Sequence, residues 1–546
     1  MKFSSQPLRY AAFLPRIRRA RIVGAAPASN GLQLLRWPVA RLAAACRLAI
    51  VGIVLAAACH TVIAQPTLTD NANLPTLGDT ERGMLSPLAE RKLGEQVMRD
   101  IRRNPDYLDD APTLEYFNNF GNDLLAARPE ARGETGNDFF FFVVRDPMLN
   151  AFALPGGFIA VHSALVIAAQ TESELASVVA HEIGHVAQRH IARMLGQQKQ
   201  DALIPLAGAI LAALAARSSP DASAAMLVGS EGLTIQRQLN FSRQAEREAD
   251  RVGVQILRDA GYETTGMVAF FGRLQSATKA YTDTTPAFLS SHPLTTERIA
   301  DIQDRIRDLR YRQHADKPEF QLIRARMRIL QDGSPQGLRD AEAVFQTQLR
   351  EKTRLQIVAG KYGLALVAHR RGDQARALAY LQEARAALQG GAPPQADSSV
   401  LDFLQIDVLL AAGKTAEAVS FADAARTRFA FSRGLARRYA DTLMAAGRTD
   451  AAIAYLRDQA QLYRQEPELA QQLAKAYSVQ GKFALQHLAM AESYALEGTL
   501  PAALDQLLLA RKSPDASFYD QAQIDARERD FQARWRTELD EQKKRK

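Results

Sequence analysis

The sequence predicts two folded parts in series: an α+β domain that is mostly helical with a small antiparallel sheet, followed by an all-α solenoid. Two observations predict this. Aromatic and β-branched runs near residues 139–162 are flanked by helical patterns, and glycines recur every 34 residues in the second half. A length of 546 residues suits two to four domains of about 100–200 residues each.

Residues 1–64 have the composition of an export signal. They contain nine Lys and Arg residues and no Asp or Glu, and an apolar run from Leu48 to Cys59 precedes Val62-Ile63-Ala64. A basic stretch, a short apolar core and small residues at a cleavage point are typical of a secretory signal peptide. We therefore expect export and cleavage after Ala64. The alternatives are a retained membrane anchor and, because Leu55 precedes Cys59 at near-lipobox spacing, lipidation at Cys59.

The leader also accounts for the charge of the chain. The formal charge is +8, but removing the nine basic leader residues from 68 leaves 59 against 60 acidic residues, a formal charge of −1. We therefore expect no nucleic-acid partner. Both cysteines, Cys46 and Cys59, lie in the leader, so His, Asp and Glu are the metal ligands available to the mature chain.

The elements of the first domain, expected over residues 81–312, follow a Pro- and Asn-rich arm over 65–80. Ser86 before Pro87 is typical of a helix N-cap and first helical position. A second helix is expected over Thr113–Ala127. Three strands are expected over Phe139–Val144, Asn150–Leu154 and Phe158–His162, and a turn at Pro155-Gly156-Gly157 joins the last two.

A helix expected over Glu172–Arg193 carries His181-Glu182-Ile183-Gly184-His185. Positions i and i+4 lie on one helix face, so both imidazoles can bind one cation. Glu182 lies beside that cation without binding it, which suits a general base for metal-activated water. The motif predicts a catalytic zinc site with one open position, although the bare pattern also occurs in helices that bind no metal.

The third ligand has two candidate sources. His190 lies five residues after His185, roughly 140° around a continuous helix, and we expect it to point away as a polar surface residue. Glu246 and Asp250 form an i,i+4 pair on a second expected helix, so one can bind the metal while the other hydrogen-bonds a ligand imidazole. Glu248 is the weaker candidate, and a solvated acidic helix face is the alternative for the whole run.

These motifs together resemble the M48 family of zinc metalloproteases. Besides the two runs above, Asn150-Ala151-Phe152-Ala153-Leu154-Pro155-Gly156-Gly157 and Ser291-His292-Pro293 with Arg298-Ile299-Ala300 match the family in order and spacing. The resemblance implies a zincin-like fold with one Zn²⁺ on His181, His185 and Glu246, Glu182 as the catalytic base and Asp250 as a supporting acid, sometimes assigned as proton donor.

The resemblance implies two further roles. The strand Asn150, Ala151, Phe152, Ala153 and Leu154 resembles an edge along which an extended substrate pairs. His292 resembles a residue that occupies the open zinc position and keeps the enzyme latent, with a simple turn residue as the alternative. The apolar run from Ala202 to Ala216 is too short to span a bilayer, and we expect a core or lid segment or a peripheral membrane contact.

The second half, expected over residues 320–546, has the period of tetratricopeptide repeats. Gly413, Gly447 and Gly481 are 34 residues apart, while Gly372 and Gly498 lie at irregular gaps of 41 and 17. Small or apolar residues recur at fixed offsets from the glycines, which favours closely packed helix pairs: Ala365, Ala377, Leu381, Ala384, Ala440, Ala452, Leu456, Ala491, Ala503, Leu507 and Ala510. An ordinary helical bundle is the alternative.

An export signal, an M48 domain and a repeat array together resemble periplasmic M48 proteases of Gram-negative bacteria. That resemblance implies degradation of misassembled outer-membrane β-barrel proteins, help in their assembly, and docking of the repeats on the barrel assembly machinery. The competing expectation is a chaperone or scaffold of outer-membrane assembly in which the peptidase is latent.

Overall fold

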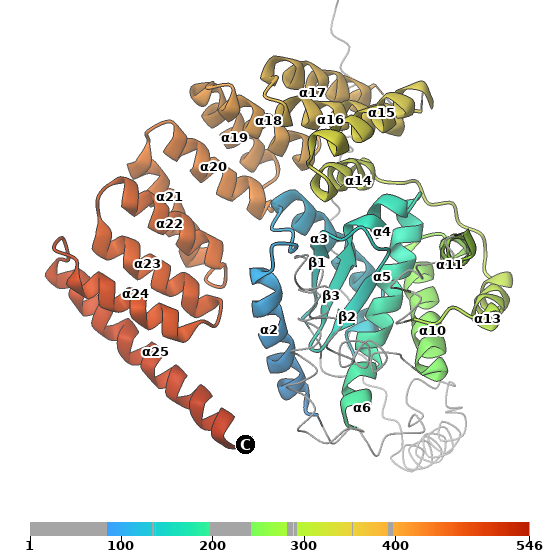
Figure 1. Ribbon diagram of the computed structural model, residues 1–546, viewed down its shortest axis with the longest axis horizontal. Coiled ribbons are helices and arrows are strands. Elements are labelled where there is room, and N and C mark those ends of the chain that lie inside the picture. Colours follow the sequence, from blue (N-terminus) through green and yellow to red (C-terminus); the bar gives the residue numbers. More distant parts are fainter. Residues whose placement is uncertain are drawn as a thin grey trace, which may run out of the picture. The chain divides into compact units, whose positions relative to one another are not determined.

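The computed structural model describes residues 85–133, 136, 138–196, 242–280, 288, 292–351, 353–390 and 397–544 (Figure 1). All of them belong to the second of two units into which the chain divides, Gly78–Lys546. The predicted leader, the arm over 65–80 and the apolar run Ala202–Ala216 lie outside the described residues. No helix within the described part is both long and apolar enough to cross a membrane.

The first half combines helices with one sheet (Figure 1). Its elements are α2 (Pro87–Arg103), α3 (Ala111–Ala127), a 3₁₀ turn η2 (Pro129–Arg132), β1 (Phe140–Val144), β2 (Ala151–Leu154), β3 (Phe158–His162), α4 (Ser163–Ala168), α5 (Glu172–Ala187), α6 (His190–Gly196), α10 (Arg243–Ala260), α11 (Thr265–Ala280) and α13 (Thr296–Arg307). The predicted start of α2 is confirmed, because the Ser86 hydroxyl accepts a hydrogen bond from the Ala89 amide and Pro87 follows it.

The sheet is mixed, so the prediction of an antiparallel sheet was wrong for one of its two strand pairings. The strand order is β1-β3-β2, with β2 antiparallel to β3 and β1 parallel to β3. The reason is the tight turn at Gly156 and Gly157, whose φ angles are 77° and 91°. This turn makes β3 antiparallel to β2, and the hairpin packs with β3 against β1, in the same direction as β1. β3 is central and fully buried, while β2 lies at an edge.

The helix predicted over Glu172–Arg193 is broken in the structure. α5 ends at Ala187, Arg189 has a left-handed φ of 51°, and α6 begins at His190. A left-handed residue with a side chain costs about 1 kcal/mol. The Arg189 guanidinium compensates, because it donates to a Glu90 carboxylate oxygen at 3.0 Å and to the Leu85 carbonyl oxygen at 2.7 Å.

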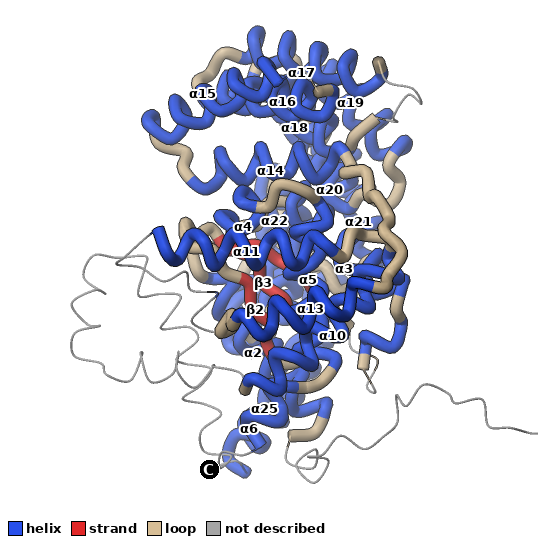
Figure 2. The backbone as a smooth tube through the Cα atoms, turned by 90° about the vertical axis from the view of Figure 1, so that its right-hand side faces the viewer, coloured by secondary structure: helices blue, strands red, loops and turns tan. Residues whose placement is uncertain are grey.

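The second half is helical, and no strand occurs among its described residues (Figure 2). Its helices are α14 (Pro318–Gln331), α15 (Pro335–Glu351), α16 (Arg354–Arg370), α17 (Gln374–Gln389), α18 (Ser399–Ala411), α19 (Thr415–Arg428), α20 (Arg433–Ala445), α21 (Thr449–Leu462), α22 (Pro467–Val479), α23 (Phe483–Leu496), α24 (Leu500–Lys512) and α25 (Phe518–Lys544). From α15 onward, helices that follow each other in the chain pack together.

The predicted glycines occupy the turns between these helices. Gly372, Gly413, Gly447, Gly481 and Gly498 each follow a helix end within two residues and have φ angles of 69–82°. The small and apolar residues predicted to pack the helix pairs are buried, all at 1% exposure or less. The helix pairs and turns thus agree with the pattern on which the repeat prediction depends.

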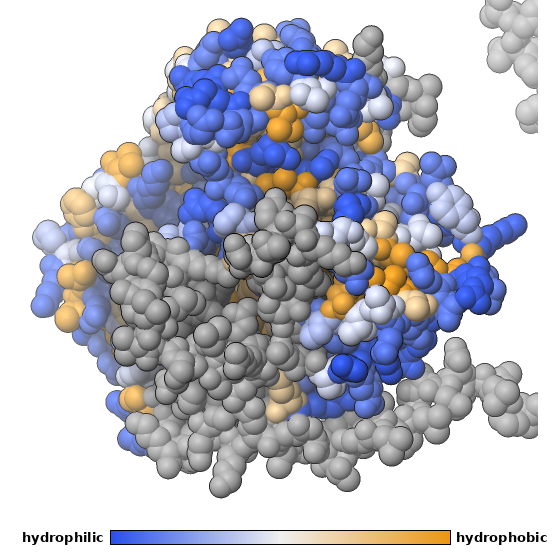
Figure 3. Space-filling view, turned by 45° about the vertical axis from the view of Figure 1, so that its right-hand side comes forward, coloured by the Kyte–Doolittle hydropathy of each residue, from blue (hydrophilic) through white to orange (hydrophobic). Residues whose placement is uncertain are grey.

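One hydrophobic cluster runs through both halves. It includes Phe117 of α3, Val179 of α5, Phe320 of α14, Phe345 of α15 and Leu401 of α18. The later helices have separate clusters. In Figure 3 most of the visible described surface is hydrophilic, with apolar side chains gathered in separate patches.

Candidate metal centre

Two helices carry the candidate site, and they pack at unusually short range. α5 and α10 lie side by side (Figure 1). A Cβ added to Gly184 would come within 2.8 Å of the Ala249 carbonyl oxygen, so only glycine permits this approach. The contact brings the His181–His185 face of α5 against the Glu246–Asp250 face of α10.

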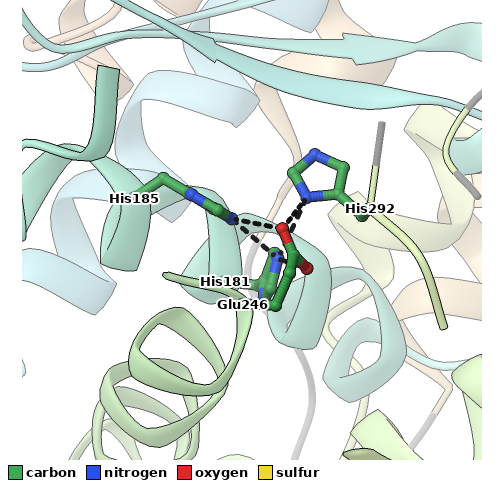
Figure 4. A group of neighbouring side chains, drawn as sticks. All are labelled: His181, His185, Glu246 and His292. Carbon is green, nitrogen blue, oxygen red and sulfur yellow. Dashed lines mark hydrogen bonds and ion pairs between the residues drawn. The ribbon is translucent and has the colours of Figure 1, made fainter. Parts of the chain in front are cut away.

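Four side chains converge between these helices: His181 and His185 from α5, Glu246 from α10, and His292 (Figure 4). Their potential ligand atoms all lie within 4.8 Å of one another. His181 Nε2 is 3.1 Å from His185 Nε2 and 3.4 Å from His292 Nδ1. A Glu246 oxygen lies 3.0 Å from His292 Nδ1 and 3.5 Å from His185 Nε2. All four residues are at most 1% exposed.

This donor set fits a divalent cation. Ligand bonds of about 2.0–2.1 Å in a tetrahedron place neighbouring donor atoms about 3.3 Å apart, and five contacts among the donor atoms here are 3.0–3.5 Å long. Three imidazoles and one carboxylate are borderline ligands that suit first-row transition metals and zinc. Burying these four groups together without a cation would be costly, since burial penalises charge.

Glu182 lies beside the four donors and is completely buried. One of its oxygens is 3.5 Å from His292 Nε2. Burial raises the pKa of Glu182, and this effect outweighs the opposing influence of His292 and His181. A raised carboxyl pKa suits proton transfer near neutral pH.

Asp250 supports the site from outside. Its carboxylate lies 2.9 Å from His181 Nδ1, on the far side of that ring from the donor group. Burial would lower the pKa of His181, but Asp250 and Glu246 outweigh it and raise the pKa to about 9. Arg298 donates two hydrogen bonds of 2.8 Å to Asp250 and lies 2.7 Å from Glu246. In the sequence, Arg298 stands out only as part of the motif Arg298-Ile299-Ala300. That motif does not predict that Arg298 contacts the two carboxylates of the site.

His190 is not the exposed residue that the helical wheel predicted. It is 3% exposed, and its Nδ1 lies 2.9 Å from His185 Nδ1. Its Nε2 lies 3.0 Å from Glu248, which also accepts a hydrogen bond from Arg193 at 2.7 Å. The prediction was wrong because it assumed a continuous helix, whereas the left-handed Arg189 turns His190 back toward α5.

The His292 segment is held in place by local contacts. The His292 amide donates to the Phe288 carbonyl oxygen at 2.7 Å, and the two rings stack at 4.8 Å. Arg298 donates to the Pro293 carbonyl oxygen at 2.9 Å. Arg298 therefore links the segment after His292 to the α10 carboxylates.

The predicted edge segment Asn150, Ala151, Phe152, Ala153 and Leu154 lies beside the site. Ala151–Leu154 form β2 at an edge of the sheet, and the Asn150 carbonyl oxygen accepts from the His162 amide at 2.9 Å. β2 packs against α5, and the proximity of the Ala153 backbone to Glu182 lowers the pKa of that carboxyl, although burial outweighs this effect. The edge therefore runs directly past the candidate base.

Comparisons with known proteins agree with this site. The profile of peptidase family M48 matches residues 124–306. The chain is 36% identical over 319 residues to the putative beta-barrel assembly-enhancing protease of Vibrio cholerae, covering 57% of this chain and 63% of that protein. It is 31% identical over 467 residues to the beta-barrel assembly-enhancing protease of Escherichia coli K12, covering 85% of this chain and 92% of that protein. The Yersinia pestis relative is 31% identical over 459 residues, with coverages of 83% and 90%.

Proposed function

Because the chain belongs to the beta-barrel assembly-enhancing proteases of peptidase family M48, we propose that it is a periplasmic zinc endopeptidase of outer-membrane quality control. In this proposal it degrades misassembled β-barrel proteins and assists the assembly of others. The observation that carries the proposal is the buried convergence of three imidazoles and one carboxylate beside Glu182.

We assign His181, His185 and Glu246 as ligands of one Zn²⁺. When bound, zinc supplies a Lewis acid that polarises the scissile carbonyl and acidifies water. Glu182 takes the proton of the attacking water and delivers it to the leaving amine, as its position and raised pKa favour. Asp250 orients His181, and Arg298 keeps Asp250 ionised by two hydrogen bonds.

Substrate binding is assigned to β2. An unfolded chain offers free backbone amides and carbonyls, and an edge strand can pair with them whatever their sequence. The packing of β2 against α5 supports this assignment, because a chain paired with β2 would then lie beside Glu182. Such recognition suits misassembled barrel proteins, because an unclosed β-barrel leaves strands without hydrogen-bonding neighbours.

His292 is assigned as a fourth ligand that keeps the enzyme latent. Its Nδ1 lies within the donor group, which leaves no donor-free position there for water or substrate. Activation then requires the His292 segment to move away, breaking the contacts with Phe288 and Arg298.

Other parts of the proposal concern location and partners. Residues 1–64 would direct export to the periplasm, with lipidation at Cys59 as the less favoured alternative. The helices from α14 onward would form tetratricopeptide repeats that dock on the barrel assembly machinery, supported by the 34-residue glycine spacing. A peripheral membrane contact would involve the apolar run Ala202–Ala216.

A chaperone or scaffold with a latent peptidase is the second candidate, favoured by the complete burial of the donor group. The variant Glu182→Gln separates the two, because it keeps the ligands but removes the base. We expect this variant to bind one zinc per chain by elemental analysis and to lose at least about a hundredfold in cleavage of an unfolded barrel protein.

The same variant is then tested in cells that lack the wild-type protein. If Glu182→Gln restores outer-membrane assembly completely, the scaffold is the main function. If purified wild-type protein contains no stoichiometric zinc, the enzyme proposal is refuted. His185→Ala serves as the control that loses both zinc and cleavage.

A further inference from the structure

We propose that His190 and Glu248 form a second positioning arm of the metal centre, which holds His185 in the tautomer and orientation needed to bind the cation. The inference rests on the proposed function, because it concerns the same site. It assigns a role to two residues that neither bind the metal nor touch the substrate.

The arm consists of two short polar contacts in a chain. His185 Nδ1 lies 2.9 Å from His190 Nδ1, and His190 Nε2 lies 3.0 Å from a Glu248 carboxylate oxygen. His185 is completely buried and His190 is 3% exposed, so bulk water does not replace these contacts. His190 makes one contact through each of its ring nitrogens. A single neutral tautomer of His190 can therefore accept a hydrogen bond from His185 and donate one to Glu248.

That pattern follows from the position of the cation. His185 Nε2 faces the donor group, 3.1 Å from His181 Nε2, and must be unprotonated to bind metal. Its proton therefore lies on Nδ1 and is donated to His190 Nδ1. His190 then carries its own proton on Nε2 and donates it to Glu248, a carboxylate that can only accept.

Glu248 is itself held in place. Arg193 of α6 donates to one of its oxygens at 2.7 Å, and Gln244 of α10 donates to the other at 3.0 Å. The arm thus joins α5 and α6, which flank the left-handed residue Arg189, to α10.

The arm complements the contact made by the other helix ligand. His181 is oriented directly by Asp250, 2.9 Å from its Nδ1. His185 reaches α10 through His190 instead. The three acidic residues of the run Glu246 to Asp250 consequently have three tasks: one faces the cation, and the other two each support one imidazole.

The test compares two substitutions of His190 in the full chain. His190→Phe keeps a ring of similar size but removes both polar atoms. His190→Asn places an amide oxygen near the position of Nδ1, where it can accept the His185 proton. The zinc dissociation constant is measured by competition with a chromophoric chelator, together with kcat, KM and the unfolding temperature of the metal-free protein.

We expect His190→Phe to weaken zinc binding by roughly 10- to 100-fold, the usual effect of losing an outer hydrogen-bond partner. His190→Asn should recover most of the affinity, and in zinc-saturated His190→Phe we expect kcat to fall while KM stays constant. His162→Phe is the matched control, because His162 is a buried imidazole at 2% exposure outside the site. We expect wild-type zinc affinity for it.

Unchanged zinc affinity in His190→Phe would overturn the inference, as would equal losses in the Phe and Asn variants, because packing would then explain the effect. If His190→Phe does not fold, Glu248→Leu decides, with at least a threefold loss of affinity expected and an unchanged affinity contradicting the arm. A wild-type protein without zinc would instead refute the proposed function.

Discussion

At the scale of single residues, His292 decides whether the proposed site is open. Its Nδ1 lies 3.0 Å from Glu246 and 3.4 Å from His181, and its ring stacks on Phe288. A fourth protein ligand is typical of structural zinc sites, whereas catalytic sites keep one position for water. In the proposed function, His292 therefore competes with the water that the reaction needs at the fourth position.

His292→Ala is expected to raise basal proteolysis, because water and substrate gain access to the fourth position. Cleavage of an unfolded barrel protein by the purified variant is the measurement, with an increase of at least severalfold expected. Unchanged or lower cleavage would show that His292 does not restrain the site. His185→Ala, which removes a proposed zinc ligand from α5, should abolish cleavage in the same assay.

At the scale of elements, the approach of α5 and α10 assembles the site. Gly184 allows it, because a Cβ there would come within 3.0 Å of both the Ala249 carbonyl oxygen and the Ala249 Cα. These are backbone atoms, which cannot relieve the clash by a rotamer change as a flexible side chain can. The spacing between these helices therefore controls the distance from Glu246 to His181 and His185.

Gly184→Ala is expected to destabilise the protein by about 1–3 kcal/mol, since the added methyl group overpacks the interface. It should also weaken zinc binding, because α10 moves away from α5. Gly272→Ala is the matched control: Gly272 lies in α11 with no atom within 4 Å of the added Cβ. There we expect stabilisation by about 0.4–1 kcal/mol. Chemical denaturation and chelator competition measure both effects, and equal results for the two variants would contradict this explanation.

At the scale of the whole molecule, the two halves share a buried ion pair. Arg326 of α14 donates to both oxygens of Asp110, the N-cap residue of α3, at 2.7 and 2.5 Å, and to the Tyr362 hydroxyl at 3.1 Å. Burial by itself raises the pKa of Asp110, but Arg326 and Thr113 outweigh it and hold that pKa below its ordinary value.

Asp110→Asn should lower the free energy of unfolding by about 3 kcal/mol at pH 7, because it leaves Arg326 buried without its counterion. Since the folded pKa of Asp110 is depressed, its contribution is complete above about pH 4 and is lost as the pH falls through the folded pKa. The difference between wild type and variant should therefore shrink below about pH 4. Denaturant titrations at several pH values measure it.

Asp123→Asn provides the control for that pair. Asp123 of α3 lies 3.1 Å from Lys317 but is 60% exposed, so we expect a change within about 0.5 kcal/mol. A loss for Asp110→Asn that is independent of pH, or no larger than that of Asp123→Asn, would contradict the role of the buried pair.

The shared hydrophobic cluster leads to a prediction about truncation. Phe320, Leu322 and Ile323 of α14 belong to the same cluster as Phe117 and Val179. A chain of residues 65–312 lacks α14 and should be cleaved rapidly by trypsin throughout. A chain of residues 65–481 keeps this cluster and should retain a resistant core. Equal resistance of the two chains would show that the first half folds without α14.

Features with local causes could be predicted from the sequence. The i,i+4 spacing of His181 and His185 places two imidazoles on one face, and Glu246 with Asp250 repeats that spacing on a second helix. Ser86 before Pro87 marks the start of α2, and the glycines from Gly372 onward mark turns, because their φ angles of 69–82° suit glycine best. Each of these depends on residues close together in the chain.

Only the tertiary structure decided features that depend on distant segments. The parallel pairing of β1 with β3 follows from how the β2–β3 hairpin packs, which the alternation of strand residues does not specify. His190 returns to His185 because Arg189 adopts a left-handed φ, stabilised by contacts with Glu90 and Leu85 about a hundred residues away. Local periodicity thus determined the candidate ligands on each helix, and long-range packing decided how they meet and which residues contact them.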